Sequence, residues 1–331
     1  MPYHLRVDAS TACQLRCPGC PTTEGKVREG LATGLLSAAA LQRLLDENPQ
    51  VGSLELSNWG EIFLNPELPD LLRIAWKRRV DITAANGVNL NSASPEALKA
   101  VVAYRVRALT CSIDGATPEV YQQYRRRGHL PRVLENIRQI QSWKRRYWSS
   151  FPRLTWQFVV FEHNHHELEQ ARQKARELGM AFVAKTSWGG LHGTQPPQAA
   201  NRGGDSERRR IERSACAQLW QAPQINHDGR LLGCCINHWG DFGNVFERPL
   251  EALLEAAPMQ AARRMLMGQT PPQEGVPCSQ CSLYHQLCSS GDWIRPEECG
   301  TSPWLAGMLR VRRCLPAGAW EVLRELRARL G

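Results

Sequence analysis

The sequence predicts an α/β protein in which a parallel sheet precedes a small cysteine-rich module. Six segments with strand character alternate with helical segments between residues 3 and 187, a pattern typical of right-handed crossovers between parallel strands. Cysteines become denser after residue 210, and regular apolar patterns become rarer there. We therefore expect a core domain over 1–188, a linker or active-site flap over 189–209 and a second module over 210–331.

Each element is expected from a local pattern. Apolar residues alternate or run together, as in strands, at 3–9, 51–58, 80–86, 106–113, 153–161 and 181–187. Helical spacing occurs at 35–48, 67–79, 95–104, 131–147 and 164–178, and a further helix begins at Pro118 with Thr117 as its N-cap. Residues 189–209 are rich in Gly, Pro and polar residues. One face of a C-terminal helix is expected to carry Trp320, Leu323, Leu326 and Leu330.

Composition and charge argue against several classes of protein. Apolar residues make up 42% of the 331 residues, which is ordinary for a globular protein, and no apolar run approaches the roughly 18 residues of a membrane span. The N-terminus lacks the features of a secretion signal, so the twelve cysteines indicate metal or redox use in a reducing cytoplasm. The net charge of +9 comes largely from arginine runs, which favour solvated helix ends over a nucleic-acid track.

Three cysteines follow the first predicted strand. Cys13, Cys17 and Cys20 have the spacing CxxxCxxC, which suits three irons of a [4Fe-4S] cube and leaves the fourth iron open. A short cysteine cluster can also bind zinc. The place of these cysteines at the C-terminal end of a strand is where a (β/α) barrel gathers its reactive groups. The sequence therefore predicts a cluster site in this loop.

With this motif and alternation the chain resembles the radical S-adenosylmethionine (radical SAM) superfamily over nearly its whole length. The resemblance implies a partial (β/α)6 barrel, with S-adenosylmethionine chelating the open iron of the cluster. It also implies reductive cleavage of this cofactor to a 5'-deoxyadenosyl radical, and an external one-electron donor such as flavodoxin or ferredoxin. Many members have an aromatic residue just before the third cysteine, whereas this chain has Gly19.

The resemblance also implies residues that contact the cofactor. Gly60 and Glu61 match the GGE motif, with Trp59 in place of its first glycine, and the Glu61 carboxylate would accept a hydrogen bond from the cofactor's amino group. A turn glycine beside a surface glutamate is the alternative. In similar enzymes the serine of an SxDG segment and a nearby arginine hold the cofactor's carboxylate and ribose. The matching residues are Ser112, Asp114 and Arg125, and Asn86 lies on the same rim. Asn-Gly and Asp-Gly are also ordinary turn formers.

The second module has its own set of cysteines. Their layout resembles the Twitch/SPASM auxiliary domains, with an especially close match to the shorter Twitch form, and implies one auxiliary [4Fe-4S] cluster with the ligands Cys216, Cys234, Cys278 and Cys281. The adjacent Cys235 is the alternative to Cys234, and a structural zinc site is the alternative to the cluster. Four thiolates close the coordination of a cube, so such a cluster suits electron transfer.

Other residues receive weaker assignments. Cys111, Cys288, Cys299 and Cys314 are expected to be buried thiols, with a second auxiliary cluster as the alternative for the last three. Asn164 is expected to cap the helix that follows it, and metal ligation by His163, His165 and His166 is the alternative. Trp188 and His192 are candidates for substrate contact.

We therefore expect an enzyme that abstracts hydrogen from a substrate and passes a second electron to the auxiliary cluster. Peptide-modifying relatives often carry an N-terminal peptide-recognition domain, and the chain starts at the first barrel strand, which favours a small molecule such as a sugar or an aminoglycoside-like alcohol. Modification of a ribosomal peptide is the alternative. A zinc-stabilised, basic nucleic-acid-binding protein is the rival from another class.

Overall fold

A seven-stranded parallel sheet forms the core of the protein. The structure, a computed structural model, describes residues 3–186 and 204–300, together with 319 and 322. The strands are β1 (His4–Val7), β2 (Ser53–Glu55), β3 (Asp81–Val88), β4 (Ala108–Ser112), β5 (Arg153–Val160), β6 (Ala181–Thr186) and β7 (Gln224–Ile225). Their order is β6-β5-β4-β3-β2-β1-β7, and neighbouring strands are parallel throughout. The sheet is open, because its edge strands β6 and β7 do not pair with each other.

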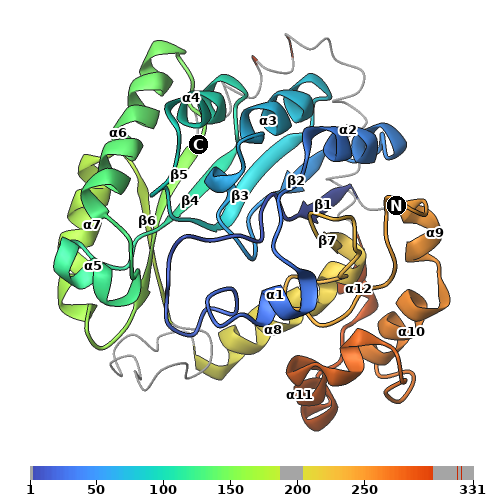
Figure 1. The fold of residues 1–331 in the computed structure, drawn as a ribbon. Coiled ribbons are helices and arrows are strands. Elements are labelled where there is room, and N and C mark those ends of the chain that lie inside the picture. Colours follow the sequence, from blue (N-terminus) through green and yellow to red (C-terminus); the bar gives the residue numbers. More distant parts are fainter. Residues whose placement is uncertain (1–2, 187–203, 301–318, 320–321, 323–331) are drawn as a thin grey trace.

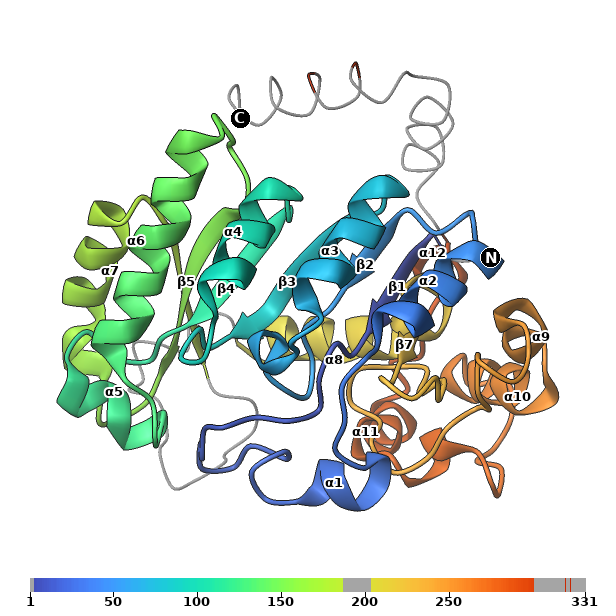
Figure 2. The same ribbon diagram turned by 45° about the horizontal axis from the view of Figure 1, so that its top comes forward.

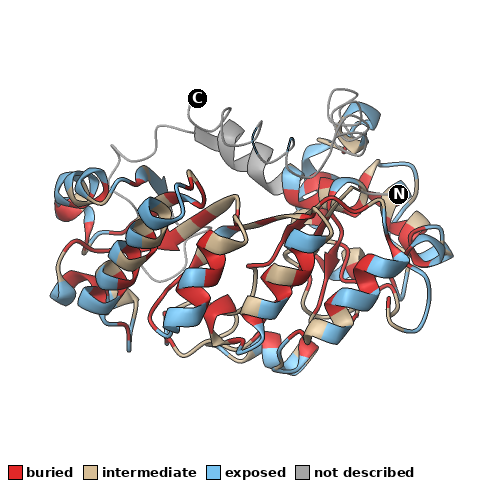
Figure 3. Ribbon diagram, turned by 90° about the horizontal axis from the view of Figure 1, so that it is seen from above, coloured by how far each residue is buried: buried red, intermediate tan, exposed pale blue. Residues whose placement is uncertain are grey.

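Helices cover one face of this sheet, as Figures 1 and 2 show. They are α2 (Ala38–Glu47), α3 (Leu68–Lys77), α4 (Pro95–Ala103), α5 (Pro118–Tyr124), α6 (Leu130–Arg146) and α7 (Leu168–Glu177). Their buried sides face the strands and their exposed sides face solvent (Figure 3). The Thr117 side chain caps α5 by accepting the Val120 N–H, as predicted. This arrangement confirms the predicted α/β fold with its TIM-like parallel sheet.

The two faces of the sheet differ in chemistry. In β5, Trp156 and Phe158 are fully buried in the apolar core, whereas Gln157 points to the opposite face because successive side chains alternate. The same alternation in β4 places Leu109 and Cys111 in the core. Parallel sheets are normally apolar on both faces, so the polar residues of the second face indicate that it lines a site.

The C-terminal module packs beside β1 and adds β7 to the sheet (Figures 1 and 2). It contains α8 (Gly204–Gln221), α9 (Leu250–Leu254), α10 (Ala257–Leu266), α11 (Ser282–Ser290) and α12 (Pro296–Cys299). The helix α8 begins at Gly204, inside the range 189–209 that was expected to be a linker or flap. The four apolar residues expected on one face of the C-terminal helix lie outside the described residues, as do Trp188, His192 and Cys314.

Two further features were not expected from the sequence. A short helix, α1 (Lys26–Leu31), follows the three N-terminal cysteines, and β7 joins the sheet with only two residues. None of the helices in the described part of the chain combines the length and apolarity that crossing a membrane requires.

Candidate iron-sulfur and cofactor site

The first cysteine set lies in the loop between β1 and α1. Cys17 is buried, and Cys13 and Cys20 are partly exposed. Burial raises the pKa of the Cys13 thiol to about 12, and the nearby Glu61, Cys17 and Cys20 add to this rise. The three thiols are therefore close enough to influence one another's charge. Their donor chemistry, three sulfurs in one loop, fits an iron-sulfur cluster with one open iron.

Arg125 joins this loop to the end of β4. Its Nε atom donates to Asp114 Oδ2 at 2.6 Å, and its Nη1 atom lies 3.8 Å from Cys17 Sγ. Asp114 is fully buried, and its second oxygen accepts the Val159 N–H at 2.7 Å. Burial acts to lower the pKa of Arg125, but Asp114 and Cys17 outweigh it and hold that pKa above its usual value. Arg125 is therefore a fixed positive charge beside a thiol that an anionic cluster would use.

Glu61 and Gly60 lie against the chain that leads into the cysteine loop. Glu61 is buried and accepts the N–H groups of Phe63 at 3.1 Å and Asn89 at 2.5 Å, and burial raises the pKa of its carboxyl to about 7. A Cβ atom on Gly60 would lie 2.3 Å from Ser10 O, so only glycine fits there. The Glu61 carboxylate thus positions backbone in this structure, and its contact with a cofactor stays a prediction.

Ser112 and Asn86 lie at the ends of neighbouring strands. Ser112 is buried, and a Cβ atom on Gly87 would lie 2.3 Å from its Oγ atom. Asn86 is exposed, and its Nδ2 atom donates to Asn58 Oδ1 at 3.2 Å. The structure brings Glu61, Asp114 and Arg125 to the cysteine loop through the contacts above. Ser112 and Asn86 lie at the same edge of the sheet, near the ends of β4 and β3, and the structure shows no contact between them and the cysteine loop among the described residues.

Sequence reasoning missed a second contact of the cysteine loop. Asn89 Nδ2 lies 3.8 Å from Cys13 Sγ, and Asn89 Oδ1 accepts from Gln14 Nε2 at 2.8 Å. The asparagine-rich segment NGVNLN after the third strand was the available signal. From the sequence we expected the first asparagine of this segment, Asn86, at the cofactor site, whereas the second, Asn89, contacts the cysteine loop.

The loop after β5 also differs from expectation. Asn164 does not cap the next helix with its side chain. Instead it is fully buried, accepts the Phe161 N–H at 2.7 Å and donates to Asp114 O at 3.0 Å. Asn164 therefore fixes this loop to the backbone of the residue that pairs with Arg125.

The second cysteine set comes from three parts of the C-terminal module. Cys216 lies on α8, Cys234 follows β7, Cys278 lies in a 3-10 helix (Pro277–Gln280), and Cys281 precedes α11. Burial raises the pKa of Cys278 to about 12, and nearby Cys281 contributes. Burial also raises the pKa of Cys234, with contributions from Cys235, Cys278 and Cys216. Cys234 therefore lies close enough to Cys216 and Cys278 to feel their charge, and Cys278 close enough to Cys281.

The hydrogen bonds of Cys235 help to decide which of the adjacent Cys234 and Cys235 is the cluster ligand. The Cys235 N–H donates to Gln218 Oε1 at 2.8 Å, and Gln218 Nε2 lies 3.4 Å from Cys235 Sγ. Cys235 therefore has its own partner, which supports Cys234 as the ligand. Cys111 is buried as expected, but Cys288 is exposed and Cys299 partly exposed, so the expectation of buried thiols is wrong for these two.

Within residues 3–186 and 204–300, no group of three or more His, Cys, Asp or Glu side chains is arranged to hold one metal ion.

Comparison with known proteins identifies the second module. A family model described as SPASM, an iron-sulfur cluster-binding domain, matches residues 216–282 and so includes all four predicted ligands. SuiB of Streptococcus suis, solved with bound S-adenosylmethionine, has a similar fold, with a TM-score of 0.63 at 12% identity over 91% of this chain and 78% of that chain. The chain has the radical SAM fold and carries a SPASM domain. The resemblance expected from the sequence is thereby confirmed.

Two further solved structures have a similar fold. SuiB bound to the precursor peptide SuiA has a TM-score of 0.61 at 12% identity, over 91% of this chain and 76% of that chain. The protein anSMEcpe, with bound AdoMet and the Cp18Cys peptide, has a TM-score of 0.57 at 12% identity over 86% of this chain and 87% of that chain. No curated protein sequence matches the chain. The family match supports iron-sulfur cluster binding by residues 216–282.

Proposed function

We propose that this protein is a radical SAM enzyme that oxidises or otherwise modifies its substrate. The observation that carries the proposal is the contact of Arg125 with the cysteine loop after β1. The Nη1 atom of Arg125 lies 3.8 Å from Cys17 Sγ, and the same guanidinium pairs with the buried Asp114. A fixed cation beside three thiols suits a site that must hold an anionic cluster. When bound, the cluster and S-adenosylmethionine supply the 5'-deoxyadenosyl radical that removes hydrogen from the substrate.

Each predicted residue has a part in this proposal. Cys13, Cys17 and Cys20 hold the cluster, and Arg125 offsets its negative charge. Glu61 holds the backbone N–H groups of Phe63 and Asn89 beside the cluster loop. Ser112 and Asn86 lie on the rim where a cofactor's polar groups would be held. The polar second face of the sheet gives the substrate a surface with hydrogen-bonding groups.

The auxiliary cluster has the ligands Cys216, Cys234, Cys278 and Cys281 in this proposal. Hydrogen abstraction leaves a substrate radical, and loss of one electron and one proton from that radical gives a product oxidised by two electrons in total. A cluster held by these four cysteines would accept that electron. An external one-electron donor such as flavodoxin or ferredoxin supplies the electron that starts the reaction.

Two substrate classes compete. A small molecule such as a sugar or aminoglycoside-like alcohol remains our prediction from the sequence. A peptide is the second candidate, and it gains support because SuiB and anSMEcpe are both described with bound peptides. A short precursor-peptide gene beside the gene for this chain would favour the peptide, and a small-molecule pathway would favour the alternative.

Anaerobic reconstitution tests the proposal. We expect roughly eight irons per chain from two cubes, broad absorbance near about 400 nm and formation of 5'-deoxyadenosine after reduction with S-adenosylmethionine present. Replacing Cys13, Cys17 and Cys20 together by alanine should abolish 5'-deoxyadenosine and leave about four irons, whereas Cys288→Ala should change neither. A colourless zinc protein with salt-sensitive nucleic-acid binding would overturn the proposal.

A further inference from the structure

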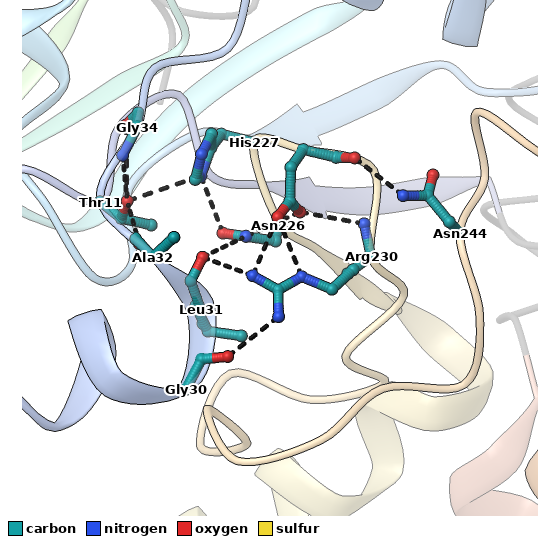
Figure 4. A network of polar contacts seen from close by, with 10 residues as sticks. Thr11, Gly30, Leu31, Ala32, Gly34, Asn226, His227, Arg230 and Asn244 are labelled. Atoms are coloured by element: carbon teal, nitrogen blue, oxygen red, sulfur yellow. Dashed lines mark hydrogen bonds and ion pairs between the residues drawn. The ribbon is translucent and has the colours of Figure 1, made fainter.

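A turn of the SPASM module hydrogen-bonds to the loop that carries the first three cysteines. This turn, residues 227–230 with the sequence HDGR, follows β7 and is referred to as the HDGR turn. The cysteine loop is defined as residues 11–34. Figure 4 shows the polar contacts between the two segments, which lie about 200 positions apart in the sequence.

The cysteine loop is closed at its base. The Thr11 N–H donates to Gly34 O at 3.0 Å, and the Gly34 N–H donates to Thr11 Oγ1 at 2.9 Å. Ser10 and Leu35 form an antiparallel bridge just outside these contacts. Both ends of the loop are therefore adjacent, and a single neighbouring element can hold them together.

Arg230 holds the end of the loop that follows Cys20. Its Nη1 atom donates to Gly30 O at 2.9 Å, and its Nη2 atom donates to Leu31 O. These carbonyls end α1, where backbone oxygens lack partners within the helix, and a positive charge is favourable there. Asp228 orients the guanidinium by accepting from Arg230 Nε at 2.9 Å, and Asn244 Nδ2 in turn donates to Asp228 O at 2.9 Å. The fork of Arg230 is therefore preoriented toward α1.

His227 lies against the other end of the loop, near Cys13. Its Nδ1 atom is 3.5 Å from Thr11 Oγ1. A Cβ atom on Gly34 would lie 1.9 Å from His227 Nε2, so the ring packs directly over Gly34 (Figure 4). One turn thus contacts both ends of the segment that carries the cysteines.

Apolar packing continues the same interface. Val27 and Leu31 of α1 form a buried cluster with Leu232, which follows the HDGR turn. A Cβ atom on Gly30 would lie 1.7 Å from His238 O, so α1 also approaches the backbone beyond Cys234 closely. The segment that contacts the first cysteine loop therefore also carries a predicted ligand of the auxiliary cluster.

We propose that Arg230 is a positioning residue for the S-adenosylmethionine site, through which the SPASM module sets the geometry of the first cluster loop. This inference rests on the proposed radical SAM function. Among the described residues the Arg230 guanidinium hydrogen-bonds to Asp228, Gly30 and Leu31 and to none of the cysteines, so it acts by fixing the last turn of α1. Loss of its fork frees the C-terminal end of the cysteine loop while the ligands themselves remain.

The test compares Arg230→Ala with a matched arginine elsewhere in the module. Arg263 also donates to two backbone oxygens, Leu219 O at 2.8 Å and Leu254 O at 3.3 Å, and neither belongs to the cysteine loop. The test uses four reconstituted proteins: wild type, Arg230→Ala, Arg230→Lys and Arg263→Ala. Three measurements compare them. These are the iron content, the EPR spectrum of the reduced clusters with and without S-adenosylmethionine, and KM and kcat for 5'-deoxyadenosine formation.

Arg230→Ala should keep both clusters and the auxiliary EPR signal, alter the signal of the first cluster with S-adenosylmethionine, and raise KM for this cofactor on the order of tenfold. Arg230→Lys should recover part of this loss because its ammonium can still reach a carbonyl, and Arg263→Ala should match wild type in KM. A wild-type KM and first-cluster signal in folded Arg230→Ala would overturn the inference, as would an equal loss in Arg263→Ala.

If Arg230→Ala does not fold, Arg230→Lys decides, because wild-type KM and signals in that variant would show that the fork is not needed. A wild-type protein that cannot cleave S-adenosylmethionine would instead contradict the proposed function. The two failures are therefore distinguishable.

Discussion

Arg125 combines two tasks that depend on its planar fork. It neutralises the buried Asp114 and presents a second nitrogen to Cys17. A lysine has the same charge but lacks this fixed geometry, so the two residues are not equivalent here. Removing the guanidinium alone leaves a buried carboxylate without its cation, which costs about 3–5 kcal/mol. A functional test therefore has to replace both partners.

We predict that Arg125→Gln combined with Asp114→Asn makes the first cluster harder to reduce. The double substitution removes one cation and one anion, but Arg125 affects the charge of the Cys17 thiol more strongly than Asp114 does. The net loss of positive potential at Cys17 should lower the reduction potential by up to roughly 60 mV, the change equivalent to a factor of ten for one electron. Redox titration followed by EPR measures this shift. The potential of the auxiliary cluster serves as the internal control, and an unchanged first-cluster potential would contradict the role of Arg125.

At the scale of elements, the sequence predicted what depends on local patterns. The strands and helices from β1 to β6 follow apolar periodicity and capping residues such as Thr117, so their approximate positions could be read in advance. The helix α1 and the two-residue strand β7 are too short to carry a pattern, and contacts with distant segments stabilise them. Arg230 and Asn89 were missed for the same reason, because they bind partners that only the folded chain brings near. The cysteine spacings were readable because ligands of one cluster recur in fixed sequence patterns.

The junction of β1 with β7 predicts a pH dependence of stability. Asp8 follows β1, is fully buried, and accepts from Gln224 Nε2 at 2.9 Å and the Trp59 N–H at 3.2 Å. Burial raises the pKa of its carboxyl from 3.8 to about 7. The folded protein therefore binds a proton that the unfolded chain releases between about pH 4 and pH 7, and stability falls as the pH rises through this window.

Asp8→Asn should remove this contribution, which amounts to about 4 kcal/mol between the ends of the window. Urea unfolding of the reconstituted wild type and variant at pH 5 and pH 8 measures the part that is lost above pH 5, which is about 3 kcal/mol. The stability of wild type relative to the variant should be lower at pH 8 than at pH 5. An equal difference at both pH values would contradict the raised pKa.

On the scale of the whole molecule, the SPASM module and the barrel share one sheet and one apolar core. The β7 strand pairs with β1, and Cys216, Leu219 and Ile225 belong to the same buried cluster as the strands of the barrel. The two cluster sites are thus parts of one packed body and are joined by the HDGR turn. Changes at one site can alter the other through structure as well as through electron transfer. Experiments on the auxiliary cluster therefore need a readout for each site.

Cys281→Ala separates the redox role of the auxiliary cluster from a structural one. Cys281 is buried beside Cys278, so its loss should remove the auxiliary cluster and leave roughly four irons per chain. If that cluster accepts the electron of the substrate radical, the variant should still form 5'-deoxyadenosine and exchange substrate hydrogen, yet yield little oxidised product. Cys288→Ala is the matched control, because Cys288 is exposed and lies outside both ligand sets.

Metal binding and folding are coupled, so the remaining iron and the affinity for S-adenosylmethionine must show that the barrel of Cys281→Ala is intact. Oxidised product at the wild-type rate from a folded variant with one cluster would show that the auxiliary cluster is structural. Loss of 5'-deoxyadenosine together with product, in a variant that keeps the first cluster, would show instead that the module acts by shaping the cofactor site. That outcome agrees with the role of Arg230 and contradicts electron acceptance as the main task of the second cluster.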